Sequence, residues 1–91
     1  MVHYSYYYYR ALDLHVIIAT RDNGDNTFSV RPVAAYFSAK SAQAYVSQYN
    51  NYLASGRKGT APRCNPSVRF LSVPDWWVEK YPNWAKMHET I

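Results

Sequence analysis

The first part of the chain alternates between two kinds of side chain. Over residues 4–18 the even positions are tyrosines, aliphatic residues and one arginine, whereas the odd positions include polar residues such as Asp13 and His15. A period of two, with many tyrosines and β-branched residues, indicates a β-strand. Because this stretch is longer than an ordinary strand, we expect a bend or bulge at residues 10–11. A short helical turn over residues 9–14 is the alternative.

A turn and a returning strand follow. Residues 21–26 (Arg-Asp-Asn-Gly-Asp-Asn) are typical of a turn, and residues 27–33 predict the second strand. A loop of three or five residues places Ile18 opposite Val30, whereas a two-residue loop mixes the two faces. Since a shift of one residue turns every side chain over, we expect the odd-length loop. Pro32 then predicts an edge strand or a strand end.

Helical spacing of apolar residues begins after Ser38. Ser38 is a favourable N-cap for a helix that runs through Leu53, and Gly56 is suited to its C-terminal end. The opposite face is polar and carries the single charge of Lys40. One apolar stripe is expected to face the sheet, flanked by Tyr45 and Tyr52, and consists of Ala39, Ala42, Val46, Tyr49 and Leu53.

The last third of the chain predicts a loop, a strand and a short helical segment. Residues 56–66 hold two glycines and two prolines and indicate a loop, and residues 68–73 predict a third strand. Asp75 is expected to cap a helical segment that Pro82 interrupts or restarts. The sequence therefore predicts one α+β domain over residues 1–91. About three antiparallel strands form a small sheet with one main amphipathic helix on one face, in the order β-β-α-β-α.

Composition narrows the class of protein. Hydrophobic residues make up 48% of the chain, which excludes a disordered protein. Cys64 is the only cysteine, so an intrachain disulfide is impossible and a reducing compartment is expected. No stretch has the pattern of a signal peptide or a membrane span. We therefore expect a soluble cytoplasmic protein.

The charge is unevenly distributed. The net charge is +4, yet no aspartate or glutamate lies between Asn26 and Pro74, where six basic residues give that region a charge of +6. A stretch of one sign predicts a positive surface that attracts anionic partners. The expected partner is a protein or nucleoprotein complex with an acidic surface, and nucleic acid itself is a possible ligand.

The candidate binding residues combine these cations with aromatic rings. Exposed tyrosine, tryptophan and arginine are typical of protein interfaces, and rings beside cations can also stack on unpaired bases. There are three alternatives. The loop cations are only solvated, the tyrosines form cross-strand pairs that stabilise the sheet, or the C-terminal segment buries both adjacent tryptophans. We expect a single contact area made of Arg57, Lys58, Arg63, Arg69, Arg10, Tyr7, Tyr9 and Trp76.

Catalytic and metal-binding patterns are not apparent. Cys64 could pair with His15 or His88 as a thiolate and imidazole, but single residues of these types occur by chance in most chains. The three histidines lack the spacing of metal ligands, and one cysteine makes a zinc site improbable. We therefore expect no cofactor, no metal and no enzymatic activity.

These features together predict a small basic binding protein rich in aromatic residues. In size, tyrosine content and lack of motifs, the chain resembles small accessory proteins of phages and mobile elements, which often inhibit a host nucleic-acid machine. The enrichment in tyrosine, tryptophan and arginine and the acid-free middle of the chain favour a module that docks on a larger protein or nucleoprotein complex and could block it sterically, as an anti-CRISPR-like inhibitor would. The alternatives are direct binding of single-stranded DNA or RNA, and a structural subunit of an assembly.

Overall fold

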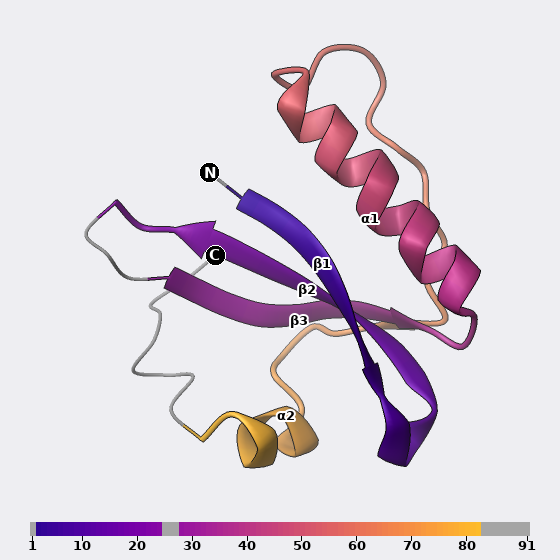
Figure 1. Cartoon of the computed structure of the whole chain (residues 1–91), viewed down its shortest axis with the longest axis vertical. Coiled ribbons are helices and arrows are strands. Elements are labelled where there is room, and N and C mark those ends of the chain that lie inside the picture. Colours follow the sequence, from indigo (N-terminus) through magenta and orange to yellow (C-terminus); the bar gives the residue numbers. More distant parts are fainter. Residues whose placement is uncertain (1, 25–27, 83–91) are drawn as a thin grey trace.

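The structure is a computed structural model that describes residues 2–24 and 28–82. Its elements, shown in Figure 1, are β1 (Val2–Tyr9), the 3-10 turn η1 (Arg10–Leu12), β2 (Leu14–Asp22), β3 (Phe28–Tyr36), α1 (Ala39–Ala54), β4 (Val68–Arg69) and α2 (Asp75–Lys80). The strands form one antiparallel sheet in the order β1-β2-β3-β4. The α+β class with one main helix is confirmed. The described part of the chain has four strands, in the sequence order β-β-β-α-β-α.

The additional strand comes from a reversal of the chain at η1. Residues 4–18 do not form one bent strand, because β1 ends at Tyr9 and β2 returns from Leu14, directly opposite it. Asp13 closes the turn with a left-handed φ of 52°, which aspartate tolerates better than most residues, and its N–H donates to the Arg10 carbonyl at 3.2 Å. The alternative of a helical turn in this stretch is therefore the one observed.

This reversal changes which residues share a face. Paired residues in β1 and β2 have positions of opposite parity, such as Tyr6 with Ile17 and Tyr9 with Leu14. Even-numbered residues of β1 therefore lie on one face of the sheet, whereas even-numbered residues of β2 lie on the other. The continuous alternation in the sequence suggests that all even-numbered residues of this stretch share one face, but the fold places those of β1 and those of β2 on opposite faces of the sheet.

The second hairpin has the expected loop parity and a shifted register. Asp22 pairs with Phe28, so the connecting loop has an odd number of residues, as expected. Ile18 pairs with Pro32 and not with Val30, a shift of two residues that leaves the same side chains on the same face. Pro32 lies beside a β-bulge and away from the two residues of β3 that pair with β4, which suits a residue without an N–H.

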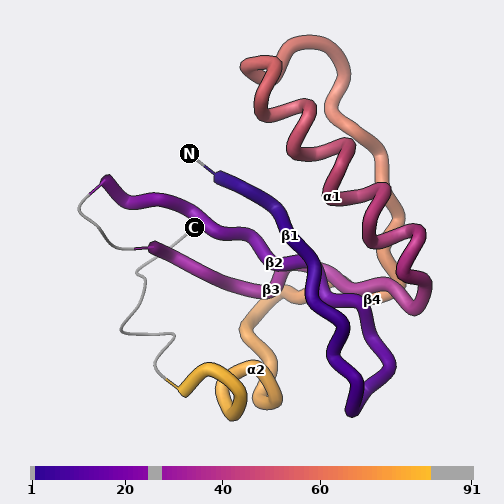
Figure 2. The backbone as a smooth tube through the Cα atoms, in the orientation of Figure 1, coloured from indigo at the N-terminus to yellow at the C-terminus, as the bar shows by residue number. Residues whose placement is uncertain are grey.

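Helices cover both faces of the sheet. The expected helix, α1, packs on one face, and the short α2 packs on the other (Figures 1 and 2). The buried residues on the α1 side are Ile17, Ala34, Tyr36 and Ala42. Those on the α2 side are Leu14, Val16, Ile18, Ala35 and Trp77. Two small cores therefore hold the fold together, one on each side of a sheet whose central strands are buried from both directions.

Helix α1 follows the prediction closely. The Ser38 hydroxyl accepts a hydrogen bond from the N–H of Ser41 at 3.4 Å, and Gly56 takes a left-handed φ of 76° just after the helix. Ala42 is buried within the expected stripe, and Tyr49 is half-buried. The expected outer face, which includes Lys40, is exposed. Local sequence signals therefore determine this helix.

The segment after α1 differs more from expectation. Strand β4 has only two residues, against the six expected over residues 68–73, because the chain leaves the sheet after Phe70 donates its N–H to the Val33 carbonyl at 3.1 Å.

Helix α2 begins at Asp75 with Pro74 at its N-cap, one residue before the expected cap. It ends at Lys80, shortly before Pro82, as a proline requires. The expected helical positions beyond Pro82 lie outside the described residues. No helix in the described ranges has the length and apolar character needed to cross a bilayer.

Candidate functional site

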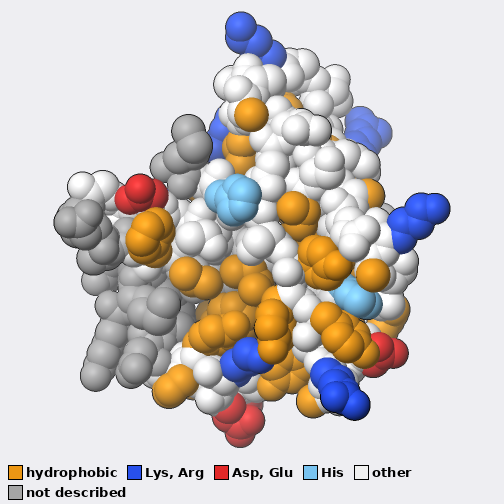
Figure 3. All heavy atoms as spheres, in the orientation of Figure 1, with side chains coloured by type: hydrophobic (Ala, Val, Ile, Leu, Met, Phe, Trp, Pro, Cys, Tyr) orange, Lys and Arg blue, Asp and Glu red, His pale blue; other side chains and the backbone are white. Residues whose placement is uncertain are grey.

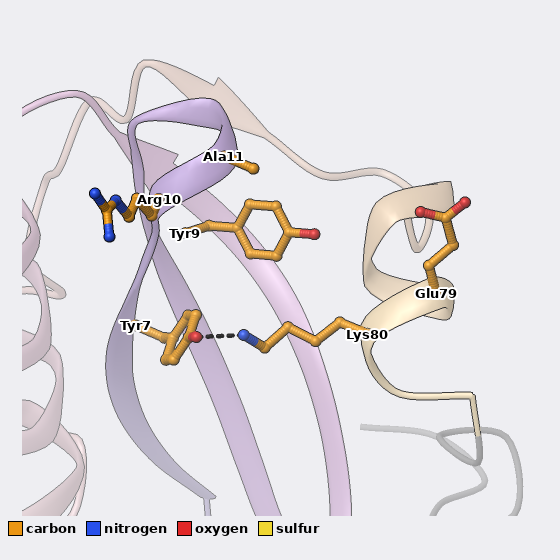
Figure 4. A pocket seen from close by; sticks show the side chains of 6 residues that line it. All are labelled: Tyr7, Tyr9, Arg10, Ala11, Glu79 and Lys80. Atoms are coloured by element: carbon orange, nitrogen blue, oxygen red, sulfur yellow. Dashed lines mark hydrogen bonds between the residues drawn. The ribbon is translucent and has the colours of Figure 1, made fainter.

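A hollow lies between the β1–β2 hairpin and α2, on the face of the sheet opposite α1. Its volume is about 420 Å³, and it is open to solvent. Figure 4 shows Tyr7 and Tyr9 projecting from β1 toward α2, and Lys80 reaching back from α2. We call this feature the Tyr7–Lys80 hollow; it is lined by Tyr7, Tyr9, Arg10, Ala11, Glu79 and Lys80.

The ammonium group of Lys80 is held by the tyrosines. Its Nζ donates a hydrogen bond to the Tyr7 hydroxyl and lies 3.9 Å from the centroid of the Tyr7 ring and 5.4 Å from that of Tyr9. The hydrogen bond to Tyr7 raises the pKa of Lys80 above its ordinary value, so the side chain is charged at neutral pH. A fixed positive charge therefore lies between two tyrosine rings at the surface.

Tyr9 is supported from the other side by tryptophan. The Tyr9 and Trp76 rings are 4.5 Å apart, and Trp76 also makes an edge contact with Phe70 at 5.7 Å. Trp77 is 1% exposed and packs into the core against Tyr81. Trp76 is thus half-buried and forms part of the hollow's support. Trp76 was expected in the exposed contact area, but α2 packs against the sheet, where Tyr9 and Phe70 cover part of its ring.

The predicted cations do not gather around these rings. Arg57, Lys58 and Arg63 are exposed on the loop that leads back from α1 (Figure 2), and the Tyr49 hydroxyl holds this loop against α1 by donating to the Pro62 carbonyl at 3.0 Å. Arg69 donates to the Cys64 carbonyl at 3.3 Å on the same segment. Figure 3 shows Lys and Arg side chains separated around the outline of the molecule.

The predicted residues therefore divide into two groups. Tyr7, Tyr9, Arg10 and Trp76 come together at the hairpin and α2, whereas the loop cations lie beside the other helix. The expected single contact area is not formed, because Tyr7 and Tyr9 face away from α1. Within the first group Arg10 points away from α2 and from both rings (Figure 4).

Lys80 was not among the site residues expected from the sequence. Its position four residues after Trp76 places both side chains on one face of a helix, and this spacing is visible in the sequence. Its partner Tyr7 is 73 positions away, so only the fold shows that the two meet. The helical spacing was therefore a usable signal, but it does not identify the partner.

The candidate catalytic groups are dispersed. His15 packs against the rings of Tyr6 and Tyr8, whereas the thiol of Cys64 lies 3.9 Å from the side-chain oxygen of Gln48 on α1. His88 lies outside the described residues. Within residues 2–24 and 28–82, no three His, Cys, Asp or Glu side chains are grouped in a way that could hold a metal ion.

Comparisons with models of known protein families, with curated proteins and with solved structures each found no match to this chain. Its function must therefore be inferred from the chemistry of its own surface. Within the described part of the chain, the Tyr7–Lys80 hollow combines aromatic rings, the Lys80 ammonium and a concave shape.

Proposed function

We propose that this chain is a non-enzymatic binding protein that docks on a larger protein or nucleoprotein complex through the Tyr7–Lys80 hollow. The observation that carries the proposal is the contact of the Lys80 ammonium with the exposed ring of Tyr7. Tyrosine and tryptophan are enriched among the residues that dominate binding energy at protein interfaces. A cation held in place before binding has less side-chain freedom to lose when a partner arrives.

The charge of the protein supports an acidic partner. Its net charge is +4, so its field favours encounters with negatively charged surfaces. A docked domain of 91 residues could act by covering a surface that the partner needs, as a steric inhibitor of a nucleic-acid machine would. This role extends the proposal and rests on the small size of the chain and its aromatic and basic composition.

Direct binding of single-stranded nucleic acid is the second candidate. The exposed cations Arg57, Lys58 and Arg63 favour it, because each phosphate contact would release counterions. The rings argue against it, since Lys80 lies over Tyr7 and Trp76 packs on Tyr9, which leaves less ring surface for stacked bases. A gel shift with single- and double-stranded DNA and RNA at two salt concentrations separates the two candidates. Binding that weakens steeply with salt would favour the second.

The proposal is tested by comparing two pairs of substitutions in a quantitative capture experiment. The wild-type protein, Tyr7→Ala and Lys80→Glu are each used to capture the partner, and the amount of partner bound by each variant is compared with the amount bound by the wild type. The control is the double variant Arg57→Glu and Lys58→Glu, which makes a larger charge change on the other side of the molecule. We expect the hollow variants to lose most of the bound partner and the control to keep it. Loss in the control alone would assign docking to the loop and overturn the proposal.

A further inference from the structure

The outer edge of β1 is unpaired in the described part of the chain. β1 is the first strand of the sheet, and its only strand neighbour there is β2. At Tyr4 this edge is occupied by α1, because the Asn50 side chain accepts from the Tyr4 N–H and donates to the Tyr4 carbonyl, both at 2.8 Å. The backbone groups of Tyr4 therefore point away from β2.

The same direction applies to Tyr6 and Tyr8. β1 and β2 pair without a register shift from Val2 to Tyr9, and in an antiparallel ladder the backbone groups of alternate residues point to opposite sides. Tyr6 and Tyr8 therefore present their N–H and C=O groups outward, as Tyr4 does. No described residue hydrogen-bonds to these four groups, in contrast with Tyr4. They form a short template for another extended chain.

The sequence of β1 does not protect this edge. Natural edge strands are commonly blunted by lysine, proline or a bulge, yet residues 2–9 contain no Lys, Arg, Asp, Glu or Pro. The pairing is regular throughout, so no bulge twists the edge away. As far as residues 2–24 and 28–82 show, an open edge rich in tyrosine therefore lies beside the Tyr7–Lys80 hollow.

We propose that this edge binds an extended acidic segment of the partner protein as an additional strand. The inference rests on the proposed docking function and specifies the form of the ligand. A strand added beside Tyr6 and Tyr8 would direct alternate side chains to the α2 face, next to Tyr7 and the Lys80 ammonium, where carboxylates are favoured. The other side chains would face Tyr8 and the Asp13 carboxylate, to which its hydroxyl donates at 2.8 Å, so uncharged residues suit them.

Charge favours such a segment over a second copy of the chain. Two copies would each carry +4, and antiparallel pairing of β1 with itself around Tyr7 would bring two Lys80 groups to the same region. An acidic segment instead brings opposite charge to the Lys80 ammonium beside Tyr7. The Asn50 amide limits the ladder at one end, so the added strand is short.

The first experiment uses the wild-type protein and synthetic peptides. The probe is a nine-residue peptide of alternating valine and glutamate, titrated at low ionic strength and followed by amide NMR. We expect the free protein to exchange the Tyr6 and Tyr8 amide protons faster than those of Tyr7 and Tyr9, and the peptide to protect the first pair. Two control peptides are used. In one, every glutamate is replaced by lysine; in the other, the amide nitrogens that would face the edge of β1, every second one, are methylated. Each control should weaken binding by about tenfold or more. No binding of the glutamate peptide, or equal binding of the methylated one, would overturn the inference.

A second experiment uses the protein's own backbone. Tyr8→Pro removes an outward N–H and should weaken peptide binding by about tenfold while the sheet stays folded. Tyr8→Ala removes the same ring and hydroxyl but keeps the N–H, so it is the matched control and should bind the peptide about tenfold more tightly than Tyr8→Pro. The exchange of the Tyr6 and Tyr8 amide protons is also measured without peptide at several protein concentrations. If it slows as the concentration rises, a second copy of the chain occupies the edge, and the inference is contradicted. If the hollow variants lose the captured partner but Tyr8→Pro does not, strand addition is wrong and docking at the hollow stands.

Discussion

The side chain of Asn50 pairs with the backbone of Tyr4 as a neighbouring strand would, with one donated and one accepted hydrogen bond of 2.8 Å each. The two residues are 46 positions apart and join α1 to the edge of β1. The Tyr4 ring adds edge and tilted contacts with Tyr45 and Tyr49 of the same helix. The position of α1 is therefore set by a polar link and an aromatic cluster together.

Removing this link should destabilise the fold. Asn50→Ala leaves a partly buried N–H and C=O without their partner, which costs about 1–2 kcal/mol of the free energy of unfolding. Urea unfolding followed by far-UV circular dichroism measures the change. Asn51→Ala, one residue along on the exposed face, is the control and should shift stability by less than about 0.5 kcal/mol. Equal effects at both positions would show that the pairing is unimportant.

The core on the α2 side depends on Trp77. Its side chain is 1% exposed, so Trp77→Ala should cost about 3–5 kcal/mol and, in so small a domain, unfold much of the population at 25 °C. Its indole Nε1 is buried without a hydrogen-bond partner among the described residues. Trp77→Phe therefore removes an unpaired donor while keeping a ring, and should cost less than half as much. Thermal unfolding compares the two variants, and equal costs would contradict this account.

Arg57 is in a backbone conformation that favours glycine. Its φ is 63°, in the left-handed region, and its side chain is exposed. Arg57→Gly should relieve the unfavourable conformation and raise the free energy of unfolding by up to about 1 kcal/mol. Arg63→Gly removes the same charge from the same loop, where the φ is not positive, and should instead lower stability by about 0.5–1 kcal/mol. Chemical unfolding that shows the same sign for both would count against the prediction.

Stability should fall in alkaline solution because of tyrosines on the α1 side. Burial is the main cause that raises the pKa of Tyr45 above the ordinary value of about 10, and it also raises the pKa of Tyr36 and Tyr49. The unfolded chain then loses these protons at lower pH than the folded chain does. The contribution of these tyrosines to the free energy of unfolding is therefore fully present below about pH 10 and is lost as the pH rises further.

This prediction is checked by the ultraviolet absorbance of tyrosinate and by urea unfolding between pH 8 and pH 12. A fraction of the tyrosines should ionise only as the protein unfolds. Tyr45→Phe should leave stability at pH 7 nearly unchanged and make its decrease above pH 10 less steep. A Tyr45→Phe variant with the wild-type pH dependence would show that Tyr45 ionises freely in the folded state.

Several parts of the fold could be predicted from neighbouring residues alone. Ser38 and Gly56 mark the ends of α1 because capping depends on hydrogen bonds within one helical turn. The odd length of the loop before Phe28 follows from the requirement that apolar side chains share a face. A helical turn at η1 was only the alternative expectation, and the reversal of the chain there was missed, since Asp13 in the left-handed region interrupts the strand without interrupting the alternation of side chains.

The candidate site was predicted only in part for a related reason. Tyr7, Tyr9 and Arg10 lie together because they are adjacent in sequence, whereas their separation from Arg57 and Lys58 depends on which face of the sheet each helix covers. The two clusters join residues far apart in the sequence, such as Val16 with Trp77 on one face and Ile17 with Ala42 on the other, and local spacing does not specify these contacts.

The sequence by itself determined the class of fold, the main helix and a basic chain rich in tyrosine, because periodicity, capping and composition act over a few residues. The tertiary structure alone decided that the tyrosines of β1 face two different layers, that Lys80 meets Tyr7 across 73 positions, and that the cations form separate groups. These outcomes depend on how distant apolar surfaces are buried together, and the spacing of residues along the chain does not specify that.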